Sequence, residues 1–179
     1  MRATPNSRLR SVTGSTGGNL REIRPPYRGG MRIETRPAGD PEIAALVTAQ
    51  QRELREADGG LDGQATVTRD DIHYLAVVLN ERAVACGGVQ TLDSGTGEIK
   101  RMYVRPAFRG RGIGRQLLVA LEELAFQQGH HTVCLETGSY LPAAIALYTS
   151  CGYAPIPVYG EYVDNPYSVC FAKRLPLAA

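Results

Sequence analysis

The sequence lacks the marks of several common protein classes. Its three histidines and four cysteines do not recur at the spacing of metal ligands, so no metal is expected. No apolar run is long enough to span a bilayer, so no membrane partner is expected either. The cysteines stand singly in apolar stretches without a Cys-x-x-Cys pair, which predicts buried free thiols and a reducing, cytoplasmic location. They are Cys86, Cys134, Cys151 and Cys170.

Positive charge is scarce outside the first 30 residues. Residues 1–30 hold six arginines against one acid, which leaves 14 basic and 17 acidic residues in 31–179. Because this larger part would repel phosphates overall, no nucleic acid partner is expected. Residues 1–30 are rich in small polar residues and predict a disordered basic extension, with a basic arm for nucleic acid as the alternative. Met31 opens a strand-like run, and we interpret it as the natural start of one domain over 31–179.

The apolar periodicity predicts an alternation of strands and helices. Strands are expected from 31, at 73–79, 83–91, 98–104, 132–137, 153–158 and 168–173, and helices over 40–56, after 114 and near 142. Asp40 and Pro41 predict the start of the first helix, which has an apolar face. That face carries Ile43, Leu46, Val47 and Leu54. A loop or short helix is expected to follow, through Arg69.

The connections between these elements predict the topology of the sheet. Short hairpins make the three strands between 73 and 104 antiparallel neighbours. The helical connection after 114 makes strand 132–137 parallel to strand 98–104. The expected fold is therefore α/β (α+β), with a single mixed, mostly antiparallel sheet of six to seven strands and helices on both faces.

A glycine-rich turn, Arg109–Gly114 (RGRGIG), leads into an apolar helix. The glycines lie where backbone N–H groups are unpaired and the helix dipole is positive, which predicts an anion cradle. The turn has neither the G-x-G-x-x-G spacing of dinucleotide folds nor the Gly-Lys-Ser/Thr of a phosphate loop. Arginines at 109, 111 and 115 instead suit a ligand with several phosphates.

Two blocks of the sequence resemble the GNAT superfamily of N-acetyltransferases. Arg109-x-x-Gly112-x-Gly114 resembles the family's Q/R-x-x-G-x-G/A acetyl-CoA signature, and residues 144–153 (AIALYTSCGY) resemble its later A-I-x-L-Y-x-x-x-G-F/Y block. The resemblance is strong over 83–175 and weaker over 31–82. It implies a sheet splayed at an acetyl-CoA cleft and transfer of acetyl to a primary amine of a small molecule or peptide, in a ternary complex. A non-catalytic acyl-CoA sensor or regulatory module is the alternative, and a homodimer stays open.

The resemblance also implies the residues that bind acetyl-CoA. The main chain of 102–104 is expected to hydrogen-bond the pantetheine amides, as an added strand would. Many family members place an asparagine seven residues before the tyrosine of the later block, where this chain has Leu141. The expected cofactor-binding set is Met102, Tyr103, Val104, Arg109, Gly110, Arg111, Gly112, Ile113, Gly114 and Arg115.

Glu98 is a candidate general base. An ammonium with a pKa of about 10.4 must lose a proton before it attacks, so a base helps. Glu98 lies eleven residues before Arg109, the offset of the catalytic glutamate in some histone-acetylating family members. Its period-two neighbours Lys100 and Met102 suggest that it faces a cleft. Ordered water is an alternative base, and a carboxylate that only caps the preceding hairpin or pairs with Lys100 or Arg101 is the structural alternative.

Tyr148 stands at the family position for the tyrosine that protonates the departing thiolate, and a buried structural tyrosine is the alternative. On the acceptor side, Glu136, Tyr159 and Tyr162 are expected to wall the amine end of the cleft. The two tyrosines lie in a Pro- and Tyr-rich stretch, 155–167, whose alternative interpretation is a long turn between two strands. Carboxylates there would favour a cationic amine.

Overall fold

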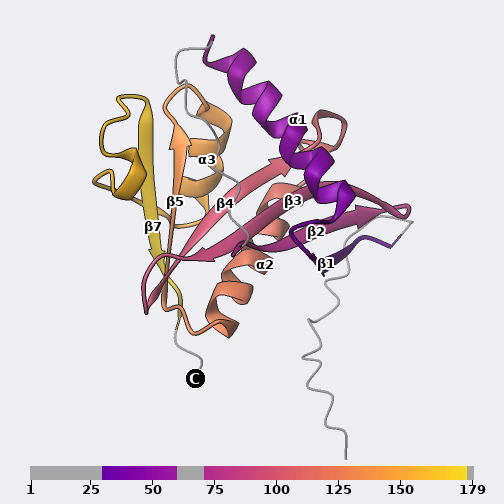
Figure 1. The fold of residues 1–179 in the computed structure, drawn as a ribbon, viewed down its shortest axis with the longest axis horizontal. Coiled ribbons are helices and arrows are strands. Elements are labelled where there is room, and N and C mark those ends of the chain that lie inside the picture. The colour runs from indigo at the N-terminus through magenta and orange to yellow at the C-terminus, as the bar shows by residue number, and fades with distance from the viewer. Residues whose placement is uncertain (1–29, 60–70, 177–179) are drawn as a thin grey trace, which may run out of the picture.

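The computed structural model describes residues 30–59 and 71–176, which form one seven-stranded sheet with helices on both faces (Figure 1). The strand order is β1-β2-β3-β4-β5-β7-β6. All neighbouring strands pair antiparallel except β4 and β5, so the mixed, mostly antiparallel sheet is confirmed. The elements are β1 (Arg32–Arg36), α1 (Pro41–Ala57), β2 (His73–Leu79), β3 (Arg82–Thr91), β4 (Thr96–Val104), α2 (Ile113–Gln127), β5 (Thr132–Gly138), α3 (Pro142–Ser150), β6 (Ala154–Ile156) and β7 (Ser168–Arg174).

Helix α1 covers one face of the sheet. The predicted N-cap is confirmed, because Asp40 Oδ1 accepts from the backbone N–H groups of Glu42 at 2.8 Å and Ile43 at 3.1 Å. Ile43 and Leu46 are buried against the sheet, in a core cluster with side chains of β2, β3 and β4. The predicted apolar face is thus confirmed at these two positions, whereas Leu54 is only half-buried and lines a cavity.

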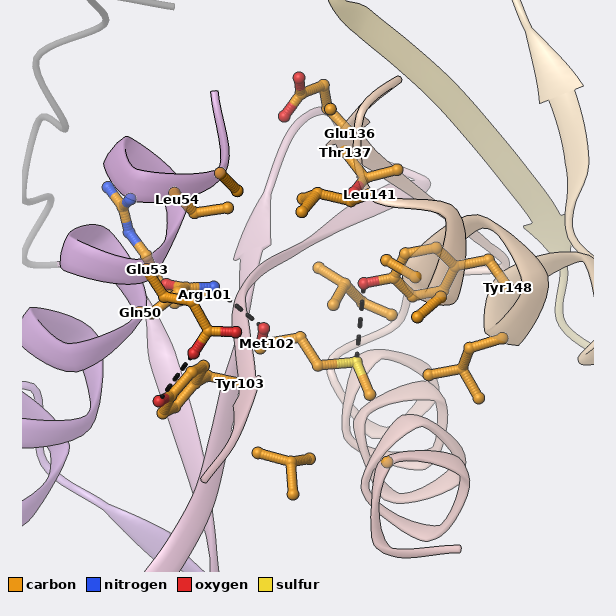
Figure 2. Close-up of a pocket in the computed structure, with 18 of the residues that line it drawn as sticks. Gln50, Glu53, Leu54, Arg101, Met102, Tyr103, Glu136, Thr137, Leu141 and Tyr148 are labelled. Atoms are coloured by element: carbon orange, nitrogen blue, oxygen red, sulfur yellow. Dashed lines mark hydrogen bonds between the residues drawn. The ribbon is translucent and has the colours of Figure 1, made fainter. Parts of the chain in front are cut away.

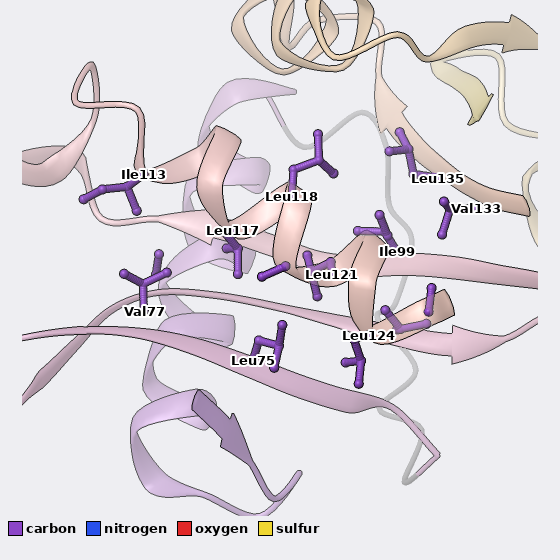
Figure 3. Close-up of a cluster of buried hydrophobic side chains, with 14 of the residues drawn as sticks. Leu75, Val77, Ile99, Ile113, Leu117, Leu118, Leu121, Leu124, Val133 and Leu135 are labelled. Atoms are coloured by element: carbon purple, nitrogen blue, oxygen red, sulfur yellow. The ribbon is translucent and has the colours of Figure 1, made fainter. Parts of the chain in front are cut away.

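Helices α2 and α3 contribute to a larger core on the opposite face (Figure 3). Leu117, Leu118 and Leu121 of α2 are fully buried there. Burial of each leucine contributes roughly 1.5–3 kcal/mol. This core fixes the start of α2, and with it the glycine turn, against the centre of the sheet.

The sheet opens between β4 and β5. These strands pair only from Thr96–Ile99 to Thr132–Leu135, after which β4 stays on β3 and β5 stays on β7. The register of β3 and β4 shifts at Arg101, which has a φ of 57° and forms a bulge. The bulge and the loss of pairing together leave a gap in the sheet beside the second half of β4.

The structure differs from a few predictions in the bounds of a strand and in the burial of a cysteine. Strand β6 covers only Ala154–Ile156 instead of 153–158, because Pro155 and Pro157 lack the N–H that a longer ladder would use. All four cysteines are free, but Cys151 is half-buried and the other three are buried. Most of the predicted basic extension and the segment through Arg69 lie outside the described residues.

Two further expectations concern the described residues alone. No helix among them is long and apolar enough to cross a membrane. No three His, Cys, Asp or Glu side chains gather there as a metal site would require, and the expectation of no metal stays a prediction.

Candidate active site

A cavity of about 940 Å³ occupies the gap between β4 and β5 (Figure 2). Its walls come from the second half of α1, the exposed stretch of β4, the glycine turn with the start of α2, and the N-terminal part of α3. Most of the predicted site residues line it: Met102, Tyr103, Val104, Arg109, Gly110, Gly112, Ile113, Gly114, Arg115, Glu136, Tyr148 and Tyr162. Three predicted residues, Glu98, Arg111 and Tyr159, do not.

The glycine turn has the backbone geometry of an anion cradle. Gly110 and Gly112 have φ of 71° and 78°, in the left-handed region where a side chain is strained. Gly112 is the N-cap of α2 and offers no side chain to the first turn. In the described chain, the first amide of this helix that bonds back to the turn is that of Gln116, which donates to the Gly112 carbonyl at 3.1 Å. The N–H groups before it suit a bound phosphate.

Arg109 is bound to α1. Its two terminal nitrogens contact both carboxylate oxygens of Glu53 at 2.7 Å, and its Nε donates to the Val104 carbonyl at 2.9 Å. The guanidinium also lies over the Tyr103 ring, 5.5 Å from its centroid. This hydrogen-bonded cation holds the pKa of Glu53 below its ordinary value.

The other two arginines of the turn also contact the protein. Arg111 lies over the Phe108 ring at 5.9 Å and does not line the cavity. Arg115 donates to Ser150 Oγ at 2.7 Å and to Cys151 Sγ at 3.2 Å, at the end of α3. Arg115 therefore joins the start of α2 to the end of α3 and still lines the cavity.

Tyr148 approaches β4 from α3. Its hydroxyl donates to the Met102 sulfur at 3.9 Å (Figure 2). Its ring packs against Tyr153 and Phe171. Burial raises the pKa of Tyr148 well above its ordinary value. The phenol is therefore protonated at neutral pH and can donate a proton into the cavity.

Glu98 is buried. The alternation of side chains along β4 suggests instead that it faces the cleft. One carboxylate oxygen accepts from the hydroxyls of Tyr159 and Tyr162, each at 2.9 Å. The other lies 3.4 Å from Lys100 Nζ, so the pairing with Lys100 considered from the sequence is present. Burial raises the pKa of both tyrosines, and the negative charge of Glu98 raises it further. Lys100 also contacts the Tyr162 hydroxyl, and both residues line the cavity.

Acidic side chains lie at the end of the cavity away from the glycine turn. Glu136 accepts from Ser168 Oγ at 2.6 Å, and Glu161 accepts from Lys100 Nζ at 2.8 Å. Both line the cavity, as does Leu141, which begins α3 without a side-chain cap. Part of the 155–167 stretch thus forms a wall of the cavity.

Sequence reasoning missed the contribution of α1. Gln50 Nε2 donates to the Met102 carbonyl at 2.9 Å, and Glu53 holds Arg109. The sequence carries a signal for both, because positions 50 and 53 continue the buried helical stripe of Ile43 and Leu46 with polar residues. A polar interruption of a buried stripe indicates a specific partner.

Known proteins with the same features identify the family. The sequence model described as the Acetyltransferase (GNAT) family matches residues 40–153, well over half of the chain. The chain belongs to the GNAT acetyltransferase family. The resemblance seen in the glycine turn and the later tyrosine block is thereby confirmed, and acyltransferase activity follows from membership.

Individual GNAT relatives agree with this assignment. An "IAA acetyltransferase" from Azospirillum brasilense is 38% identical over 111 residues, which cover 62% of this chain and 72% of the relative. An uncharacterized N-acetyltransferase of Bacillus subtilis, YsnE, is 32% identical over 107 residues, or 59% of this chain and 71% of that protein.

Solved GNAT structures share the fold. A protein from Klebsiella pneumoniae, described as a candidate acyl-CoA N-acyltransferase, superposes with a TM-score of 0.71 at 35% identity, over 81% of this chain and 97% of its own. A GNAT acetyltransferase from Elizabethkingia anophelis with acetyl-CoA bound superposes with a TM-score of 0.61, over 81% and 98%. At 17% identity, the second similarity concerns the fold alone.

Proposed function

We propose that this GNAT acetyltransferase moves an acetyl group from acetyl-CoA to a primary amine of a small molecule or peptide, by direct transfer in a ternary complex. One observation carries the proposal. A single cavity connects the glycine turn, the unpaired stretch of β4, the Tyr148 hydroxyl and an acidic end with Glu136 and Glu161. Its volume of about 940 Å³ is at the upper end of the range of ligand-binding cavities.

The donor side is built for an extended ligand that ends in phosphates. The N–H groups of the glycine turn suit the pyrophosphate of acetyl-CoA. The main chain of 102–104 can hydrogen-bond the pantetheine amides, since β4 has lost its β5 neighbour there. The Met102 and Val104 carbonyls already accept from Gln50 and Arg109, and each keeps a second lone pair. Leu141 offers this arm an apolar contact in place of the amide that many family members have. Related folds from Elizabethkingia anophelis and Bacillus subtilis hold acetyl-CoA and CoA, respectively.

Tyr148 acts on the leaving group in this proposal. As the amine nitrogen bonds to the acetyl carbon, the carbon–sulfur bond breaks and the thiolate takes the Tyr148 proton, which water returns to the phenolate when CoA leaves. The raised pKa keeps the phenol protonated before the reaction and makes it a weaker acid, so the proton moves only as negative charge develops on the sulfur. A thiolate is already a fair leaving group, so the contribution is modest.

Glu98 serves as the base through its neighbours. Because the carboxylate does not line the cavity, the proton from the acceptor passes through Tyr162, which lines the cavity and donates to Glu98, while the Lys100 ammonium beside them has no lone pair to accept it. In the route through Tyr162, the phenol oxygen accepts the amine proton as its own proton moves to Glu98. Glu136 and Glu161 favour an acceptor that arrives as a cation.

A thiol-release assay with acetyl-CoA across a panel of amines tests the proposal. The panel contains diamines, amino acids and peptides with a free N-terminus. IAA, which the Azospirillum relative's name mentions, is tested beside these amines. We expect turnover with a cationic primary amine and a product heavier by one acetyl group. Tight CoA binding without turnover of any acceptor would indicate the acyl-CoA sensor instead.

A further inference from the structure

We infer that Arg109 is a positioning residue that locks α1 onto the donor turn through Glu53, and that it does not bind phosphate. The inference rests on the proposed function, because it treats α1 as the acceptor wall of the same cavity. Sequence reasoning predicts the opposite role, since Arg109 opens the acetyl-CoA signature. The two roles make opposite predictions for donor and acceptor binding.

Three of the five N–H donors of the Arg109 guanidinium, one on each nitrogen, already have protein partners. Two contact both oxygens of Glu53 at 2.7 Å, and Nε donates to the Val104 carbonyl at 2.9 Å. Such a two-pronged pair fixes both the distance and the orientation of the partners. The Tyr103 hydroxyl donates to the same Glu53 carboxylate at 3.2 Å, and the Tyr103 ring lies beneath the guanidinium.

A second contact from α1 lies one helical turn before Glu53. Gln50 Nε2 donates to the Met102 carbonyl at 2.9 Å, in the bulged stretch of β4. The second half of α1 is therefore joined to the donor turn and to the strand that faces Tyr148, while Glu42 near its start accepts from the Ala83 backbone N–H at 3.0 Å. Figure 2 shows Gln50, Glu53 and Leu54 on the opposite side of Met102 from Tyr148.

This arrangement makes α1 the wall on which an acceptor can rest. The core of α1 and the core of α2 lie on opposite faces of the sheet, and the donor turn begins α2. The Glu53–Arg109 pair is the ionic contact that joins the donor turn to the α1 wall across the cavity. Loss of this pair leaves Gln50 and the packing of Ile43 and Leu46 to hold α1, so the second half of the wall loosens while the N–H groups of the turn stay intact.

The size of the effect follows from the exposure of the pair. The side chains are 44% and 39% exposed, so water and salt weaken the attraction. We expect Arg109→Gln and Glu53→Gln each to raise the KM for the acceptor about fivefold, with kcat changed less. The double variant should be no worse than either single variant, because both remove one interaction. Arg109→Lys should recover part of the loss.

Calorimetric titration with CoA separates the two roles of Arg109. If Arg109 only positions α1, the Kd for CoA changes less than twofold in both single variants and in Arg109→Leu, which removes the polar group that glutamine would keep at this signature position. A tenfold weaker Kd in Arg109→Leu, with Glu53→Gln unaffected, would overturn the inference and make Arg109 a phosphate ligand. The matched control is Arg32→Gln, which breaks an equally two-pronged pair with Glu81 at 2.7 Å outside the cavity and should leave the acceptor KM unchanged.

Failure of the proposed function can be told apart from failure of the lock. If no amine is turned over, the proposed function fails. Hydrogen exchange of the CoA-bound protein then still tests whether the Glu53–Arg109 pair holds α1 on the donor turn. Arg109→Gln should then speed exchange over residues 50–57 of α1, and Arg32→Gln should not. If turnover is normal and the acceptor KM is the same in all variants, the lock alone is refuted.

Discussion

The Tyr148 hydroxyl lies 3.9 Å from the Met102 sulfur, across the gap where β4 separates from β5 (Figure 2). A thioether is a weak acceptor, so the phenol has no strong partner to give up. The same hydroxyl can therefore donate to another sulfur that enters the gap. This relationship joins the strand proposed to hold the donor to the residue proposed to protonate its thiolate.

The first prediction concerns Tyr148→Phe. We expect kcat to fall by about 10²-fold or less, because the thiolate leaves fairly well without a proton. The KM for acetyl-CoA should change little, since the ring and its contacts with Tyr153 and Phe171 remain. Steady-state kinetics across the pH range checks this. Full activity at every pH would remove Tyr148 from the mechanism.

The second prediction compares Tyr159 and Tyr162, whose hydroxyls both donate to one carboxylate oxygen of Glu98. Tyr162→Phe and Tyr159→Phe each remove a 2.9 Å hydrogen bond to Glu98, so each should cost about 1–3 kcal/mol of stability, and Tyr162→Phe, which also loses its contact with Lys100, should cost the more. Only Tyr162 lines the cavity, so only Tyr162→Phe should lower kcat/KM at neutral pH, on the order of 10²-fold. This loss should shrink toward pH 10, where the free amine needs no base.

Urea unfolding alongside the pH–rate profile makes this comparison quantitative. Glu98→Gln should resemble Tyr162→Phe in its pH–rate profile. Equal activity losses in Tyr159→Phe and Tyr162→Phe would instead mean that Glu98 only supports the segment that carries both tyrosines.

The third prediction concerns the glycine turn. Gly112→Ala places a side chain at a φ of 78°, which should destabilise the protein by roughly 1–2 kcal/mol and distort the anion cradle. We expect CoA binding to weaken at least tenfold. Gly129→Ala is the matched control, because its φ of 89° imposes the same strain outside the cavity. Equal CoA affinity in both variants would contradict an anion site at the turn.

The fourth prediction concerns the N-cap of α1. Asp40→Ala should lower the free energy of unfolding at pH 7 by about 1 kcal/mol, because two backbone N–H groups lose their acceptor. The Arg36 guanidinium, followed by these backbone bonds, holds the pKa of Asp40 below its usual range. A carboxylate with a lowered pKa stabilises the fold above its unfolded pKa, and that stabilisation is lost as pH falls through the folded value.

Asp40→Asn separates the cap from the charge. Asparagine caps a helix at any pH but cannot pair with Arg36, so its stability should depend less on pH below about 4 than that of the parent. Urea unfolding at pH 7 and pH 3.5 measures both effects. An identical pH dependence in the two proteins would show that Asp40 titrates alike in the folded and unfolded states.

Local patterns were sufficient to predict most of the fold. Short hairpin loops predicted the β2–β3–β4 order, and the helical connection predicted the parallel β4–β5 pair, because each constraint acts between neighbours in sequence. The N-cap at Asp40 was equally local. The bulge at Arg101 was not predicted, since it depends on how β3 and β4 adjust to the core beneath them.

The surroundings of the site residues were harder to predict. Glu98 was expected to face the cleft, but β4 is still paired with β5 at that point, and two tyrosines from 61 and 64 residues away cover the carboxylate. Likewise Glu53, 56 residues from Arg109, contacts the arginine that the family signature suggested for phosphate. Local periodicity can mark a polar residue within a buried stripe, as at Glu53, but it does not identify the distant partner.

Mass-resolved thiol release tests the central claim most directly. Protein, acetyl-CoA and a cationic primary amine are mixed, and free CoA and acetylated amine are quantified together, with Tyr148→Phe measured in parallel. The account predicts equal amounts of both products and a slower but otherwise similar reaction in the variant. CoA released without acetylated amine, or no release with any acceptor despite tight CoA binding, would contradict it.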